Sequence, residues 1–187
     1  EMNFEFKGND EDIKSLIGYP LEIMFQDLGV EQDVVWDFVE AYRQRYKLIS
    51  KEQTQLLENT IEALKLAKSF ARLSIVTTKT GSSSVSLLEH LDIMQYFEFV
   101  TGRENVEHPK PHPEPILKTL DLMDIEKTSN IWMVGDTHLD LLSASSAGIN
   151  SVGVLCGYGE EEELKEFTSF VTPNSLEAVK LIHDYKI

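Results

Sequence analysis

The sequence predicts an α/β protein with a parallel-sheet core, preceded by a smaller part that is entirely helical. From about Leu56 onward, short apolar segments alternate with amphipathic helical segments, which is typical of βαβ units. Residues 131–134 are four apolar residues in a row, as expected of a strand buried on both faces. After Phe6, the first fifty or so residues contain helical patterns and no convincing strand. We therefore expect a helical domain over residues 1–55 and an α/β domain over residues 56–187.

In the first part, Asn9 can cap a helix over residues 11–17, which Gly18 would end. Pro20 suits the first turn of a second short helix. A third helix is predicted by an apolar stripe at helical spacing, made of Val35, Phe38, Val39, Tyr42 and Tyr46.

In the second part, apolar runs and turn residues place strands and helices alternately. The expected strands are residues 73–76, 97–100, 131–134, 151–155 and 170–171. The expected helices are centred on residues 57–64, 85–91, 113–123 and 175–183, with one more after residue 136 and another beginning in the acidic run 160–163.

Composition limits the classes of partner. The net charge of −15, from 17 basic and 32 acidic residues, would repel a nucleic-acid backbone. The single cysteine, Cys156, permits no internal disulfide and fits a reducing compartment. No apolar run is long enough to span a membrane, and no signal peptide is visible. We expect a cytoplasmic protein, monomer or homodimer, without a nucleic-acid or membrane partner.

Two carboxylates follow the buried strand at residues 131–134. Gly135 ends the strand, where we expect a sharp turn, and Asp136 comes next. Asp140 lies on the first turn of the following helix, on the same face as Asp136. Two such acids repel each other unless a cation lies nearby, so a hard divalent metal is the natural partner. Helix capping by Asp136 is the structural alternative.

Other strand ends carry polar residues that packing does not require. Thr77 and Thr78 follow the strand at residues 73–76, and Lys110 lies in a proline-rich loop. A lone lysine in a loop is usually only solvated, but two flanking prolines hold Lys110 rigidly. Hydroxyl, ammonium and carboxylate groups on one edge of a sheet suit a phosphoryl group and a magnesium ion.

These segments resemble the haloacid dehalogenase-like hydrolases, closest to the phosphoglycolate phosphatase branch. Val-Thr-Thr-Lys, Thr-Gly-Arg with the later Lys110-Pro-His-Pro, and Val-Gly-Asp-Thr-His-Leu-Asp are similar to the second, third and fourth motifs of that family, in the right order. The resemblance implies a Rossmann-like core with a small helical cap. It implies a Mg²⁺-dependent phosphatase that hydrolyses small phosphorylated metabolites, such as 2-phosphoglycolate, through an aspartyl-phosphate.

The resemblance also implies roles for residues. Thr77 would be catalytic and, with Thr78, bind the phosphoryl oxygens. Lys110 would stabilise the nucleophile and the phosphate. Asp136 would ligate Mg²⁺, and Asp140 would support that metal site. The branch usually has Asn where this chain has Thr78, which leaves the substrate open.

The family's first motif, Asp-x-Asp-Gly-Thr, is absent from this sequence. Either the sequence starts inside the cap, with residues 1–8 as the preceding loop, or residues 4–9 are a decayed first motif with Glu5 and Lys7 in place of the two acids. We favour the first explanation, which makes the cap incomplete at its N-terminus. Both leave a central strand position that the missing segment, residues 2–6 or a partner must fill, because unpaired backbone in a core is costly.

We expect this chain alone to be inactive. A non-catalytic phosphate- or protein-binding relative is an alternative, and so is a sugar-phosphate mutase. A true dehalogenase is disfavoured because it has no use for the metal that paired acids suit.

Overall fold

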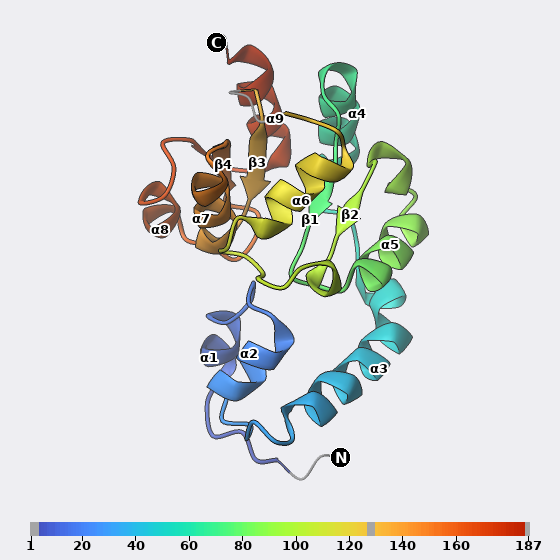
Figure 1. The fold of residues 1–187 in the computed structure, drawn as a ribbon, viewed down its shortest axis with the longest axis vertical. Helices are drawn as coiled ribbons and strands as arrows, with labels where there is room; N and C mark the ends of the chain where they lie inside the picture. Colours follow the sequence, from blue (N-terminus) through green and yellow to red (C-terminus); the bar gives the residue numbers. More distant parts are fainter. Residues whose placement is uncertain (1–3, 127–129, 186–187) are drawn as a thin grey trace. The chain divides into compact units, whose positions relative to one another are not determined.

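The computed structural model describes residues 4–126 and 130–185. The chain divides into two compact units, Glu1–Thr54 and Gln55–Ile187 (Figure 1). In the part that the structure describes, no helix is long and apolar enough to cross a membrane. Cys156 is a free, half-buried thiol.

The regular elements described in the first unit are three helices, α1 (Asp10–Lys14), α2 (Leu21–Asp27) and α3 (Val35–Gln53). As predicted, Asn9 caps the first of them, and its side-chain oxygen accepts a hydrogen bond from the backbone N–H of Glu11 at 2.7 Å. The predicted apolar stripe packs α3 against α2, with the rings of Phe25 and Phe38 at 5.8 Å. Partly buried aromatic rings and the buried valines Val35 and Val39 of α3 therefore hold this unit together.

Phe4 belongs to this helical unit. Its ring meets the ring of Phe38 edge-on at 5.5 Å, and residues 4–7 form no strand. The described part of the segment 2–6 therefore does not occupy the central strand position, and Met2 lies outside the described residues. This arrangement gives no support to the decayed first motif built on Glu5 and Lys7.

The second unit alternates strands and helices, as predicted. Its strands are β1 (Ile75–Val76), β2 (Val100–Thr101), β3 (Trp132–Gly135), β4 (Asn150–Val154) and β5 (Val171–Thr172). Its helices are α4 (Thr60–Phe70), α5 (Gly81–His90), α6 (Glu114–Leu122), α7 (His138–Ala147), α8 (Glu161–Lys165) and α9 (Ser175–Asp184), with short 3₁₀ turns η1 (Met94–Tyr96) and η2 (Arg103–Asn105). All strand pairings are parallel, which confirms the predicted fold class.

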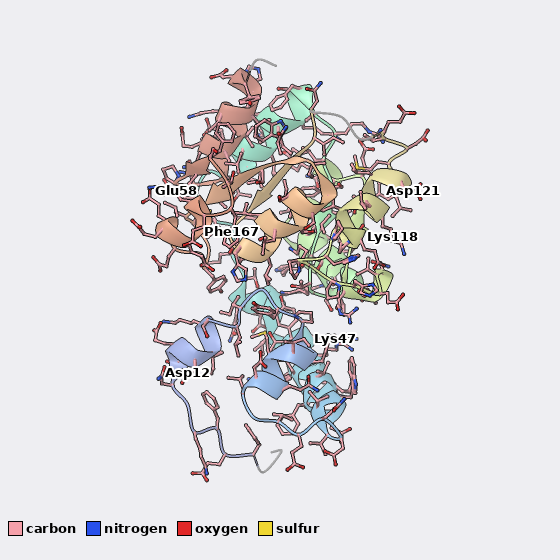
Figure 2. All side chains as sticks on the ribbon, turned by 60° about the vertical axis from the view of Figure 1, so that its left-hand side comes forward. Asp12, Lys47, Glu58, Lys118, Asp121 and Phe167 are labelled. Carbon is pink, nitrogen blue, oxygen red and sulfur yellow. The ribbon has the colours of Figure 1, made fainter. Side chains whose placement is uncertain are left out.

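Helices cover the strands on both faces. On one face, α6 and α7 bury Ile116, Leu120, Ala144 and Ala147. The outer face of α6 carries exposed charges such as Lys118 and Asp121 (Figure 2). On the other face, α9 packs on β3 and β4 through a cluster that includes Val134, Val152 and Ala178. Side chains of β3 therefore alternate between the two layers, as the pleat requires.

The strands form two separate sheets, β1–β2 and β3–β4–β5. Among the described residues, no strand joins β1 to β3. Yet Val76 of β1 and Met133 of β3 pack against the same buried cluster from α6 and α7. The facing edges of β1 and β3 thus border the position where the expected topology has its central strand.

Candidate functional site

Lys110 and Asp140 form a buried ion pair at the carboxyl edge of the strands. Lys110 Nζ donates to Asp140 Oδ1 at 2.5 Å and to the carbonyl oxygen of Val76 at 3.3 Å. The side chains are only 10% and 7% exposed. The end of β1, the proline-rich loop and the start of α7 therefore meet at one ammonium group. The bond from Lys110 to Pro111 is cis.

Asp140 is further fixed by Thr137, the residue that begins α7. Asp140 Oδ2 accepts from the backbone N–H of Thr137 at 3.2 Å and from its hydroxyl at 3.0 Å. This is the carboxylate half of a capping box, in which the third helical residue satisfies the N-cap amide. Asp140 thus caps its own helix and holds Lys110. Our sequence analysis missed the contribution from Thr137, although Thr-x-x-Asp before an apolar run is a capping-box pattern.

Asp136 is less enclosed than Asp140. Its Oδ2 accepts from the backbone N–H of Tyr158 at 3.0 Å, and its carbonyl oxygen accepts from Gly159 at 2.8 Å. Within residues 4–126 and 130–185, no hydrogen-bond donor reaches Asp136 Oδ1. Helix capping, the structural alternative for Asp136, is not its role here, because Thr137 occupies the N-cap position.

Glycines allow both carboxylates to lie where they do. A Cβ on Gly135 would lie 2.2 Å from Cβ of Asp140, and a Cβ on Gly157 would lie 2.0 Å from Oδ2 of Asp136. As predicted, β3 ends at Gly135 and the chain bends at residues 136–137, but Gly135 does not have a positive φ. Close approach of a side chain to the backbone is therefore the reason for this glycine.

Thr77 directly follows β1. Its backbone N–H donates to the carbonyl of Thr101 at 2.9 Å, which extends the β1–β2 ladder, and its hydroxyl accepts from the N–H of Lys79 at 3.1 Å. The hydroxyl hydrogen is thus available to an incoming acceptor. Thr78 is half-buried in the same turn. The carbonyl of Val76, immediately before Thr77, is the one that Lys110 contacts.

The loop that carries Lys110 is anchored at both ends. Glu114, the first residue of α6, accepts from the backbone N–H groups of Glu107 at 2.8 Å and His108 at 2.9 Å. These donors hold the pKa of Glu114 at about 2, well below its usual value. Ser143 of α7 donates to the carbonyl of His112 at 2.8 Å. The loop is therefore fixed in the position that lets Lys110 reach Asp140.

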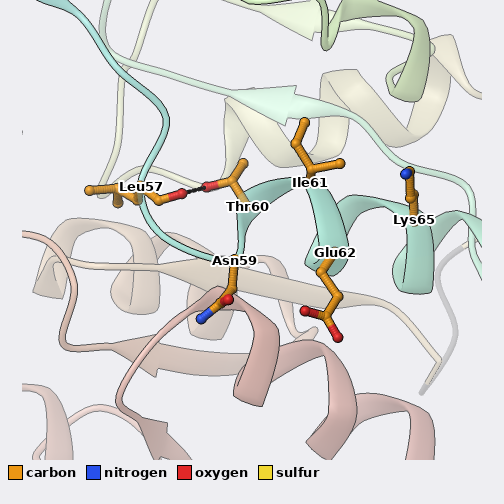
Figure 3. A pocket seen from close by; sticks show the side chains of 6 residues that line it. All are labelled: Leu57, Asn59, Thr60, Ile61, Glu62 and Lys65. Carbon is orange, nitrogen blue, oxygen red and sulfur yellow. Dashed lines mark hydrogen bonds between the residues drawn. The ribbon is translucent and has the colours of Figure 1, made fainter.

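A surface hollow lies elsewhere, at the start of α4. It is lined by Leu57, Asn59, Thr60, Ile61, Glu62 and Lys65 (Figure 3). The hydroxyl of Thr60 donates to the carbonyl of Leu57 at 2.7 Å there. None of the predicted site residues lines this hollow, so it is no part of the candidate site.

The donor set at the carboxyl edge fits a hard divalent cation. Asp136 offers a carboxylate oxygen without a hydrogen-bond donor, and Mg²⁺ commonly binds through one or two carboxylates while keeping several waters. Asp140 has fewer free acceptor positions, because both of its oxygens already receive hydrogen bonds. Of the two carboxylates, Asp136 is therefore the one that could bind a cation directly, and Asp140 the one that could support it.

Comparison with known proteins places the chain in a family. The model of the family described as "Haloacid dehalogenase-like hydrolase" matches residues 1–154. A probable phosphatase, IndB, of Dickeya dadantii (strain 3937) is 34% identical over 159 residues, which are 82% of this chain and 69% of that protein. A pyrophosphatase, PpaX, of Bacillus mycoides (strain KBAB4) is 33% identical over 145 residues, 77% of this chain and 66% of that protein. The matched region thus spans about two thirds of these relatives.

Solved structures agree in fold. A haloacid dehalogenase-like family protein of Streptococcus pneumoniae, SP0104, has a TM-score of 0.79 at 26% identity, over 93% of this chain and 81% of that one. A structure described as a predicted phosphoglycolate phosphatase, from Haemophilus somnus, has a TM-score of 0.81 at 20% identity, over 95% of this chain and 84% of that one. The match over residues 1–154 and the shared fold show that this chain belongs to the haloacid dehalogenase-like hydrolases.

Proposed function

We propose that the chain is the metal- and phosphate-binding part of a Mg²⁺-dependent phosphatase that acts on small phosphate monoesters. The observation that carries this proposal is the Lys110–Asp140 pair. A buried ammonium group, hydrogen-bonded to the carbonyl just before Thr77 and to Asp140 in the first turn of α7, is held in one place at the edge where phosphoryl oxygens would bind. Preorganised charge in a site shielded from water is an effective way to stabilise a phosphoryl-transfer transition state.

Each residue has a role in the proposal. Thr77, with Thr78 beside it, donates to phosphoryl oxygens through its hydroxyl. Lys110 neutralises charge that develops on the phosphoryl group and keeps the nucleophile ionised. Asp136 would hold Mg²⁺, supported by Asp140, and a bound Mg²⁺ supplies positive charge to the phosphate. The helical residues 1–55 would act as the cap that excludes water from the site.

The nucleophile is the missing part. In the proposal, an aspartate of an Asp-x-Asp-Gly-Thr segment attacks phosphorus, an aspartyl-phosphate forms, and water hydrolyses it. No such segment occurs in this sequence, and β1 and β3 have no strand between them among the described residues. The proposal is that a strand ending in this segment pairs with both edges. Without it, we expect the chain to bind phosphate but not to hydrolyse an ester.

Two substrates are worth testing. The sequence resemblance favours 2-phosphoglycolate, whereas the name of the relative from B. mycoides, at 33% identity, favours inorganic pyrophosphate. Both present a terminal phosphoryl group to the same edge. The single cysteine fits a reducing, cytoplasmic compartment. Because the net charge is −15, a small phosphorylated metabolite would have to be held by a local basic group or a metal.

A non-catalytic binding role is the alternative from another class. It would follow if the native protein has no Asp-x-Asp-Gly-Thr segment at all. The intact mass and N-terminal sequence of the native protein decide this. A mass equal to the 21.3 kDa of this chain would favour the binding role, and a larger mass with that segment would favour the enzyme.

The activity test compares three proteins: the chain alone, the chain preceded by a strand with Asp-x-Asp-Gly-Thr, and that same longer protein with its first Asp changed to Asn. Phosphate release from 2-phosphoglycolate and from pyrophosphate is measured with and without Mg²⁺. We expect activity in the second protein only. Full Mg²⁺-dependent activity of Asp136→Asn in that protein would overturn the site assignment.

A further inference from the structure

Three potential metal ligands outside the candidate site formed by Thr77, Lys110, Asp136 and Asp140 lie together. They belong to the loop that carries Lys110 and to the start of α6. The ligand atoms of His108, His112 and Glu114 all lie within 4.8 Å of one another. His108 Nδ1 is 3.0 Å from Glu114 Oε2, and the imidazole centroids of His108 and His112 are 4.7 Å apart. Within the described residues this is the one group of three or more His, Cys, Asp or Glu side chains whose ligand atoms lie this close together.

We propose that His108, His112 and Glu114 bind a transition-metal ion of the Zn²⁺ class. Two imidazoles and a carboxylate suit Zn²⁺, Ni²⁺ or Cu²⁺, whereas Mg²⁺ prefers oxygen ligands alone. Three protein ligands with water in a fourth position are typical of an open zinc site. The exposure of His108, whose side chain is 58% exposed, leaves room for that water.

The distances are close to those that a shared ion needs. Two ligands bound to one zinc ion at tetrahedral angles are about 3.3 Å apart. The pair His108 Nδ1 and Glu114 Oε2, at 3.0 Å, needs to open by only a few tenths of an ångström once the ion replaces the shared hydrogen. The remaining contacts, up to 4.8 Å, close by rotation of an exposed imidazole.

Glu114 is prepared for this role. Its carboxylate is held in place by hydrogen bonds from the backbone N–H groups of Glu107 at 2.8 Å and His108 at 2.9 Å. Among the described residues, the one donor to Glu114 Oε1 is Glu107 N, and a carboxylate oxygen has two acceptor sites. Binding through His112 has a cost, since its Nδ1 now accepts from the N–H of Glu114 at 3.2 Å. The expected site is therefore of moderate affinity.

The site is placed to act on Lys110. His108 and His112 lie two residues before and two residues after it in the sequence. An ion bound to both histidines and to Glu114 would restrict the motion of residues 108–112, the segment that carries Lys110. This effect on Lys110 matters for catalysis only if the proposed phosphatase function holds, whereas the binding itself does not depend on that function.

Binding is tested by titrating the chain with Zn²⁺ in excess Mg²⁺, which keeps Asp136 occupied, with isothermal titration calorimetry as the readout. We expect one Zn²⁺ per chain. His108→Ala and His112→Ala should each weaken binding roughly tenfold or more, as the loss of a ligand implies. His90→Ala, which removes an exposed histidine at the end of α5, is the matched control and should bind as the parent does.

Circular dichroism checks that each variant is folded. We expect all of them to fold, because the substituted histidines are exposed. The absence of Zn²⁺ binding by the parent chain would overturn the proposal. So would Zn²⁺ binding that survives in the double variant His108→Ala/His112→Ala, because the ion would then sit on other ligands. Loss of binding in His90→Ala as well would point to non-specific capture by surface histidines and would also overturn it.

Discussion

The two ends of the β3–α7 turn carry the same side chain in opposite environments. Asp140 is buried and receives hydrogen bonds from Lys110 and from both donors of Thr137. Asp136, four residues earlier, is half-buried and receives one side-chain hydrogen bond, from the N–H of Tyr158. The difference teaches that a pair of acids at metal-ligand spacing need not share one role. The enclosed acid fixes the site, and the more open one is free to bind an ion.

The largest effect is expected for Asp140→Asn, which tests the enclosed acid of this comparison. The change leaves the Lys110 ammonium buried without a counter-charge, so we expect the free energy of unfolding to fall by about 3 kcal/mol. Urea denaturation measures it. Lys110→Met in the same chain should restore much of the loss, because the unpaired charge is then gone. A loss well below about 1 kcal/mol would mean that the pair is not enclosed as described.

Substitution of the glycine beside each acid should also distinguish the two acids, with smaller losses in the free energy of unfolding. Gly135→Ala would place a Cβ 2.2 Å from Cβ of Asp140, on a helix that cannot easily shift, and we expect a loss of about 2 kcal/mol. Gly157→Ala would place a Cβ 2.0 Å from Oδ2 and 2.4 Å from Cβ of Asp136. Both residues lie in bends outside the helices and strands, where the backbone can shift more easily, so a smaller loss of about 1 kcal/mol is expected. Equal losses in urea denaturation would contradict the difference in enclosure.

Asp136→Asn tests the open end of the turn. An Asn oxygen can still accept from the N–H of Tyr158, so the free energy of unfolding should change by less than about 0.5 kcal/mol. Mg²⁺ affinity, measured by calorimetry, should fall at least about tenfold, since the anionic ligand is removed. Unchanged Mg²⁺ affinity would show that the ion binds without Asp136. Strong destabilisation would remove the contrast with Asp140.

An exposed ion pair gives the smallest effect and serves as a reference for the buried one. Arg72 donates hydrogen bonds to Glu98 through Nη2, at 2.5 Å, and through Nε. These hydrogen bonds hold the pKa of Glu98 below its usual 4.5. A lowered folded-state pKa stabilises the protein above pH 4.5, and this contribution is lost as pH falls through the folded value. Glu98→Gln should therefore flatten the acid dependence of the urea midpoint slightly. A variant with an unchanged acid profile would indicate that solvent screens the pair completely.

Local sequence patterns, namely hydrophobic periodicity, helix caps and turn residues, predicted much of the fold. Apolar runs and helical stripes located most strands and helices of both units. β1 is shorter than the predicted 73–76, and β2 (Val100–Thr101) shares only Val100 with the predicted strand 97–100. Backbone bonds such as Glu98 N to Leu73 O at 2.8 Å continue the pairing before β1. Motif order pointed to the family, which the match over residues 1–154 confirms. These signals work because periodicity, capping and turn preference depend on neighbours in sequence.

Tertiary structure alone decided which groups meet. Lys110 and Asp140 are 30 residues apart, and Asp136 and Tyr158 are 22 apart, so no local pattern encodes either contact. The close approach that requires Gly135 and the sharing of Asp140 between a helix cap and a lysine both arise from how α7 packs beside the strands. Packing is set by the summed contacts of many distant side chains. The sequence by itself therefore determined which residues lie at the carboxyl edge, and only packing assigned each of them its partner.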